Sequence, residues 1–69
     1  MTNEKKLFAM DLATLMTVEQ LANETKKSQE EILLSFMKSN TAKMLYDDST
    51  KLWWDGSSAI AEEYKTENR

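Results

Sequence analysis

Apolar residues recur at helical spacing in several segments of the chain, and they are densest between residues 28 and 48. That stretch holds Ile32, Leu33, Leu34, Phe36, Met37, Met44, Leu45 and Tyr46. Several of these positions share one face at a period of 3.6 residues, the pattern of an amphipathic helix with a buried side. We therefore expect this stretch to form the centre of the fold, with the flanking segments covering it.

The central stretch opens with a start signal and contains an interruption. Ser28 followed by Glu31 forms a capping box, in which the serine oxygen accepts from the Glu31 N–H. The run 39–41 (Ser-Asn-Thr) either lies inside one long helix or separates two helices. Serine and asparagine compete for backbone groups inside helices and are frequent at caps. We favour the break, which predicts helices over residues 28–39 and 41–48.

Two further helices are predicted before the central stretch. The segment 3–16 carries Leu7, Phe8, Met10, Leu12, Leu15 and Met16, which include sets at i, i+3 and i+4. Thr17 and Gln20 form a second capping box, and Met16 is placed to pack on Leu21 as a hydrophobic staple. We expect a new helix over 17–26 that buries Val18, Leu21 and Ala22, with a kinked continuation of the first helix as the alternative.

The C-terminal third begins with an aromatic pair and a turn. Asp55-Gly56 is a turn signal, and glycine suits a positive φ. A hairpin across this turn is disfavoured, because an isolated hairpin is marginally stable and the chain offers no third strand. We instead expect Ser57 or Ser58 to cap a helix over 57–66 that buries Ala59, Ile60 and Tyr64.

These elements predict an all-α fold, a small bundle of four to five short helices in a single domain over residues 1–69. The ends at about 1–3 and 66–69 are expected to fray. With 69 residues the chain is near the lower size at which one core suffices, so a homodimer is a possible arrangement.

Composition removes most catalytic chemistry. The chain has no cysteine and no histidine, which excludes disulfides, thiol chemistry and histidine-based triads and leaves no ordinary zinc site. Asp47, Asp48 and Asp55 could be considered as paired carboxylates or calcium ligands. Lys51 and Trp53 spoil the alternating oxygen ligands of a calcium loop, so a solvated helix end and turn explain the aspartates better. We expect no enzyme activity, no cofactor and no bound metal.

The charge balance bears on partners and location. Nine basic and twelve acidic residues give a net charge of −3 and a pI near 4.8. An acidic chain is poorly suited to non-specific binding of nucleic acid or anionic membranes. No apolar run approaches the roughly 20 residues that span a bilayer, and no signal peptide is evident. We expect a cytoplasmic protein without membrane contact.

The segment 17–36 has the layout of a helix-turn-helix motif. Ala22 and Ile32 lie ten positions apart, as packed residues of such motifs do, but Lys26 occupies the place of the usual turn glycine. The second helix would begin with Glu30 and Glu31, whose carboxylates would face phosphates at the end that normally contacts DNA. An acidic DNA-binding regulator is therefore the alternative function.

Trp53 and Trp54 are the most specific feature of the chain. Adjacent side chains cannot point the same way, so we expect one indole in the core and the other more exposed. Tryptophan and tyrosine are enriched at binding hot spots. We therefore take Trp53, Trp54, Tyr46 and Tyr64 as candidate residues for binding a protein partner. The five methionines also suit an adaptable surface, although filling of the core is their commoner use.

Several short runs between Ser28 and Tyr64 are similar to a group of short bacterial helical proteins of unknown function, some encoded beside toxin–antitoxin-like genes. The runs are S-x-x-E-I-L, F-M-K-S-N-T, L-Y-D-D, L-W-W-D-G and I-A-x-x-Y. The chain lacks the histidine and the β-branched C-terminal run of the better-defined members. The resemblance implies a small partner-binding protein, and it carries over no functional residue. The leading expectation is a non-catalytic interaction or regulatory protein of an antitoxin-like kind.

Overall fold

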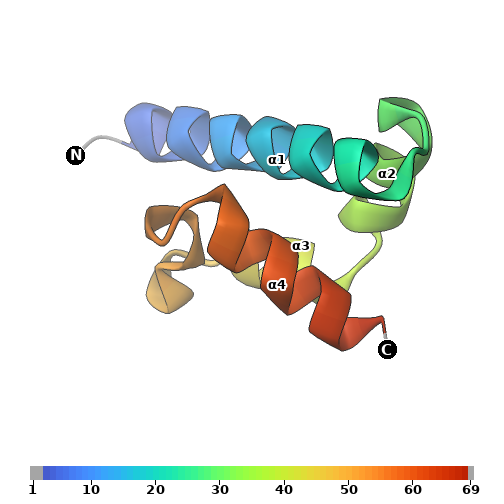
Figure 1. Ribbon diagram of the computed structural model, residues 1–69. Helices are drawn as coiled ribbons and strands as arrows, with labels where there is room; N and C mark the ends of the chain where they lie inside the picture. Colours follow the sequence, from blue (N-terminus) through green and yellow to red (C-terminus); the bar gives the residue numbers. More distant parts are fainter. Residues whose placement is uncertain (1–2, 69) are drawn as a thin grey trace.

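The computed structural model describes residues 3–68, and this part of the chain is helical without a strand. Its elements are α1 (Asn3–Thr25), α2 (Gln29–Met37), α3 (Asn40–Leu45), the 3-10 turns η1 (Asp48–Thr50) and η2 (Leu52–Trp54), and α4 (Ser57–Glu67). Figure 1 shows α1 spanning the molecule, with α4 along one side of it and α2 at its C-terminal end. The predicted all-α fold is confirmed.

The two N-terminal helices that we predicted are one continuous helix of 23 residues, so the helix start at Thr17 was wrong. Thr17 is fully buried, and its hydroxyl donates to the Ala13 carbonyl at 2.7 Å. A threonine hydroxyl can be satisfied inside a helix by the carbonyl four residues earlier, so Thr17 does not have to act as a cap. The staple also fails, because Met16 is exposed.

The buried side of α1 is not the side that we predicted. Of the six apolar residues expected to form the buried stripe, only Met10 is buried; Leu7, Phe8, Leu12, Leu15 and Met16 are exposed. The side that faces the core consists instead of Met10, Ala13, Thr14, Thr17, Val18, Leu21 and Ala22. These residues are mostly small, and small side chains let α4 and α2 approach the α1 backbone closely. The expected burial of Val18, Leu21 and Ala22 is confirmed.

The predicted break in the central stretch is confirmed, but α2 ends at Met37 instead of Ser39, and α3 covers Asn40–Leu45 instead of 41–48. The Ser28 oxygen accepts from the Glu31 N–H at 3.2 Å and caps α2. Ser39 caps α3 in the same way, because its oxygen accepts from the Ala42 N–H at 3.1 Å. Each serine satisfies one of the backbone donors that a helix start leaves without an intrahelical partner.

Helix α3 has only six residues, and the far end of the chain helps to hold it. The Glu67 carboxylate accepts from the backbone N–H groups of Asn40 and Thr41, both at 2.8 Å, and from the Thr41 hydroxyl at 2.7 Å. These bonds, with that of the Thr41 hydroxyl first, hold the pKa of Glu67 below its ordinary value. Of the positions expected to fray, residues 1, 2 and 69 lie outside the described residues.

The core is centred on Phe36, Leu45 and Ile60, whose side chains have no exposure to solvent. They come from α2, α3 and α4, so the central stretch does form the centre of the molecule as expected. Two members of its apolar cluster, Leu34 and Met37, are exposed instead. Met37 lines a surface groove together with Leu33 and Tyr46.

The turn before α4 follows the predicted turn signal, but the helix start differs. Gly56 has φ +94°, a conformation that side chains disfavour, and it occupies the N-cap position of α4. Ser57 and Ser58 therefore lie inside the helix, and the predicted serine cap was wrong. Ile60 is buried and Ala59 and Tyr64 are partly buried, as expected for the inner side of this helix.

Candidate interaction surface

The two tryptophans lie on the short turn η2 and divide as expected between core and solvent. Trp53 is partly buried and packs against the core, whereas Trp54 is 73% exposed. Their rings meet edge to face with centroids 5.5 Å apart. This geometry is favourable for aromatic pairs, so the buried ring supports the exposed one. Trp54 is the member of the pair that can contact a partner.

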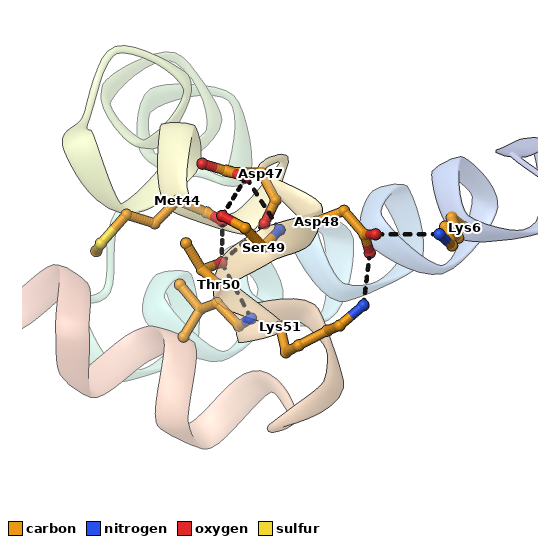
Figure 2. Close-up of polar contacts among 8 residues, drawn as sticks. Lys6, Met44, Asp47, Asp48, Ser49, Thr50 and Lys51 are labelled. Carbon is orange, nitrogen blue, oxygen red and sulfur yellow. Dashed lines mark hydrogen bonds and ion pairs between the residues drawn. The ribbon is translucent and has the colours of Figure 1, made fainter.

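A polar network around η1 positions this turn. Lys51, between η1 and η2, has φ +54°, and its ammonium lies 5.9 Å from the centre of the Trp53 ring. Figure 2 shows the Asp48 carboxylate between two ammonium groups, those of Lys6 on α1 and of Lys51, each at 3.0 Å. These cations, Lys6 first, hold the pKa of Asp48 below its ordinary value. The network ties η1 and η2 to the N-terminal half of α1.

The neighbouring aspartate is also engaged in structure. The Asp47 carboxylate accepts from the Ser49 hydroxyl at 2.7 Å and from the Ser49 N–H at 3.0 Å, which caps η1 and lowers the pKa of Asp47. The Thr50 hydroxyl closes the turn by donating to the carbonyl oxygens of Met44 and Asp47 (Figure 2). Across residues 3–68, no three acidic side chains gather as metal ligands would.

A continuous apolar strip runs along the outer side of α1. Phe8, Leu12, Leu15 and Met16 follow one another over two turns of the helix, and Phe8 is 70% and Leu15 60% exposed. Leu7, also exposed, lies next to Phe8 beside the N-terminal end of the strip. Helical residues three and four apart are neighbours on the surface, so these side chains form one patch.

The strip is bordered by a shallow groove on the side of η2. Leu12 and Met16 of α1 form one wall of this groove, Trp53 and Trp54 form the other, and its volume is about 320 Å³. Beyond the tryptophans a second hollow of about 390 Å³ lies between them and the stems of Lys6 and Lys51. Trp54 therefore stands between two hollows as an exposed aromatic ridge.

A further groove borders the strip on the side of α2. Leu15, Leu33, Met37 and Tyr46 line it, and its volume is about 410 Å³. The Tyr46 hydroxyl donates to the Asp11 carboxylate and accepts from the Thr14 hydroxyl. Burial first, and then the bond to Asp11, raises the pKa of Tyr46 above its ordinary value. This groove therefore combines the bonded polar groups of Asp11, Thr14 and Tyr46 with apolar side chains.

The four predicted partner-binding residues do not form a single site. Trp53 and Trp54 touch, but Tyr46 lies across α1 from them in the groove beside α2. Tyr64 packs on Phe36, with ring centroids 5.5 Å apart, and serves the core. Trp54 and Tyr46 border the strip on α1, and that strip joins their two grooves.

The strip itself was missed as a surface because its residues were assigned to the core. The signal that could have revealed it is that α1 is apolar on two sides: Phe8, Leu12 and Leu15 on one, and Met10, Val18 and Leu21 on the other. A helix with two apolar sides needs two neighbours. In this molecule α2 and α4 cover only one of them.

The segment resembling a helix-turn-helix buries both of its marker residues in the core. Ala22 and Ile32 are both buried, and Lys26 has φ +63°, the conformation that the usual glycine of such a turn adopts. Glu30 and Glu31 are exposed in the first turn of α2. The N-terminal end of α2 therefore presents two carboxylates to solvent, as the sequence predicts.

The chain was compared with protein-family profiles, curated proteins and solved structures, and none of them matches it. None of the helices within residues 3–68 has the length and apolar content needed to cross a lipid bilayer.

Proposed function

We propose that this chain is a small non-catalytic interaction protein, with a regulatory or antitoxin-like role, that binds a protein partner through the apolar strip on α1 and the Trp54 ridge. The observation that carries the proposal is the exposure of Phe8, Leu12, Leu15, Met16 and Trp54 on neighbouring parts of one surface. Soluble monomers rarely leave such contiguous apolar areas uncovered unless the area binds something.

The size of the surface supports a protein partner. From the exposed fractions of these side chains and of Leu7, roughly 600–700 Å² of mainly apolar area faces solvent. That is at or above the largest patch of a typical monomer and close to the roughly 800 Å² that one partner contributes to a standard interface. The apolar strip on α1 has a groove on each side, and this shape is suited to an elongated apolar element such as a helix.

The available polar groups favour binding over catalysis. The chain has neither histidine nor cysteine. Of the three aspartates around η1 and η2, Asp47 and Asp48 already accept hydrogen bonds and ion pairs that hold η1 in place, and Asp55 is exposed at the end of η2. The centre of the proposed binding surface holds aromatic, leucine and methionine side chains and no charged ones. This is the composition of an interface core.

The test is capture of a partner from the native lysate by the tagged protein after nuclease treatment. Phe8→Ser and Trp54→Ser are expected to abolish capture, because both remove large exposed apolar area without touching the buried core. Leu34→Ser is the matched control: Leu34 is 65% exposed but lies on α2, and this change should leave capture intact.

Circular dichroism of each variant shows whether the fold persists. Equal loss of capture by Leu34→Ser and by the surface variants, or capture that survives both Phe8→Ser and Trp54→Ser, would contradict the proposal.

A DNA-binding regulator is the second candidate, because the burial of Ala22 and Ile32 and the conformation of Lys26 are those expected of a helix-turn-helix. If this function holds, Lys26→Glu with Lys27→Glu should abolish retention on DNA, since phosphate contacts by lysine dominate such affinity. Unchanged retention would remove the candidate. Glu30 and Glu31 at the start of α2 are the reason that we rank it second.

A further inference from the structure

Five of the exposed residues of α1 lie along one side of the helix. Lys5, Phe8, Leu12, Leu15 and Glu19 are separated by three, four, three and four residues. This alternation is the heptad spacing of helices that pack side by side, with apolar residues along the seam. Phe8, Leu12 and Leu15 form the apolar middle of the seam, and a charged residue of opposite sign stands at each end.

We propose, building on the function proposed above, that the partner of this surface is a second copy of the same chain. The two α1 helices would pack antiparallel about a twofold axis near Leu12. In this arrangement Phe8 of one copy lies beside Met16 of the other, and the same contact is repeated by symmetry.

The end charges select the antiparallel direction. Antiparallel packing about Leu12 places Lys5 of one copy beside Glu19 of the other at both ends of the seam. Parallel packing would instead set Lys5 against Lys5 and Glu19 against Glu19. Opposite charges at the edges of a helical seam set partner orientation, and like charges oppose it.

The area is also of the size that a stable dimer needs. Complete burial of the surface on both copies would remove at most roughly 1,200–1,400 Å² from solvent, at the lower limit of the range for specific interfaces. Trp54, on the far side of the groove that begins at Leu12 and Met16, is placed to pack along the helix of the second copy. A helix in that position would cover the apolar side of α1 that α2 and α4 leave open.

The first test is the molar mass of the full chain by sedimentation from micromolar to millimolar concentrations. We expect a reversible dimer. Leu12→Glu, which places two like charges at the twofold axis, should weaken the dimer at least tenfold, and Leu34→Glu on α2 should leave it unchanged. A monomer at every concentration, or a dimer that survives Leu12→Glu, overturns the proposal.

Charge reversal tests the direction of packing. Lys5→Glu alone and Glu19→Lys alone should each weaken dimerisation several-fold, because each creates two like-charged contacts. The double variant restores opposite charges and should recover the dimer. Failure of the double variant to recover it would overturn the antiparallel arrangement.

Cross-linking gives an independent measure, since the natural chain has no cysteine. Leu12→Cys should form an intermolecular disulfide on mild oxidation. Lys5→Cys and Glu19→Cys, whose positions lie about 21 Å apart along the axis, should cross-link only when the two variants are mixed. Cross-linking of Lys5→Cys with itself would indicate parallel packing and contradict the proposal.

The outcomes separate this inference from the function on which it rests. A monomeric protein that captures a different partner through Phe8 and Trp54 would retain the proposed function and overturn self-association. A dimer that depends on Leu12 and captures nothing further would establish self-association and remove the case for a different partner.

Discussion

Two neighbouring residues of the same type have different tasks in this molecule. The Trp53 ring packs against the core, and the Trp54 side chain is exposed to solvent. The burial of Trp53 has a cost: its indole N–H is buried and meets no acceptor among the residues that the structure describes. A buried donor without a partner loses its hydration without compensation, which costs about 1–3 kcal/mol. The stabilisation that the packed Trp53 ring provides must be larger than this cost.

Substitutions at the two positions should therefore differ in a specific order. Trp53→Ala should lower the free energy of unfolding by about 2–4 kcal/mol, because it leaves a cavity beside the core. Trp53→Phe should cost no more than about 1 kcal/mol, because the lost area is partly offset by removal of the unpaired N–H. Trp54→Ala should change stability by less than about 0.5 kcal/mol.

Urea denaturation followed by circular dichroism measures all three at low protein concentration. A Trp53→Phe variant as unstable as Trp53→Ala would show that the unpaired N–H carries no appreciable cost.

At the scale of elements, α1 continues through Thr17, although the sequence around it resembles a helix start. It ends at Thr25, just before Lys26, although lysine is not a typical residue for ending a helix. Thr14, Thr17 and Thr25 each donate to the carbonyl four residues earlier, so the helix accommodates them without a break. At this end the Lys26 N–H bonds the Ala22 carbonyl, while the φ of Lys26 is +63°. Side chains disfavour this left-handed conformation, and glycine adopts it freely.

Lys26→Gly is accordingly expected to stabilise the protein by about 0.5–1 kcal/mol, the relief of left-handed strain less the added freedom of the unfolded chain. Lys27→Gly removes the same charge at a neighbouring position without a positive φ, so it should be neutral or slightly destabilising. Thermal unfolding of the two variants provides the comparison. Equal effects would show that the conformation of Lys26 is not strained.

At the scale of the whole molecule, carboxylates connect elements that are distant in sequence. Glu24 on α1 pairs with Lys65 on α4 at 2.6 Å, Asp48 pairs with Lys6 on α1, and Glu67 holds the start of α3. Hydrogen bonds from these partners, Lys65 first in the case of Glu24, keep the pKa of each carboxyl below its ordinary value. Ionised carboxylates are thus part of how the helices are joined.

The pH dependence of stability follows with a definite sign. A carboxyl whose pKa is lower in the folded protein than in the unfolded chain contributes stability above the unfolded pKa, about 4–4.5, and loses it as pH falls through the folded value. We therefore expect the melting temperature to fall from about pH 5 toward pH 2. Glu67→Gln should flatten this decline and lower stability at neutral pH.

Glu63→Gln, an exposed change on the same helix, is the control for that measurement. A decline as steep in Glu67→Gln as in the parent protein would show that the contact between α4 and α3 does not contribute.

Features set by local physics were predictable from the sequence. Ser28 begins a helix because its oxygen reaches a backbone donor three residues on, and Gly56 takes a positive φ because it lacks a side chain. The helical class follows from one glycine, no proline and apolar spacing near 3.6 residues. The exposure of one tryptophan and the partial burial of the other follow from strict adjacency.

Features that depend on a choice between neighbours were decided only by the tertiary structure. Thr17 could cap a helix or be buried within one, and the packing of α4 and α2 against α1 buries it. The two sides of α1 are both apolar, so periodicity cannot rank them. Close approach of the neighbouring helices favours the side with Ala13, Thr14 and Thr17, because small side chains permit it. That choice turns Phe8, Leu12 and Leu15 outward, and with them the surface proposed to bind.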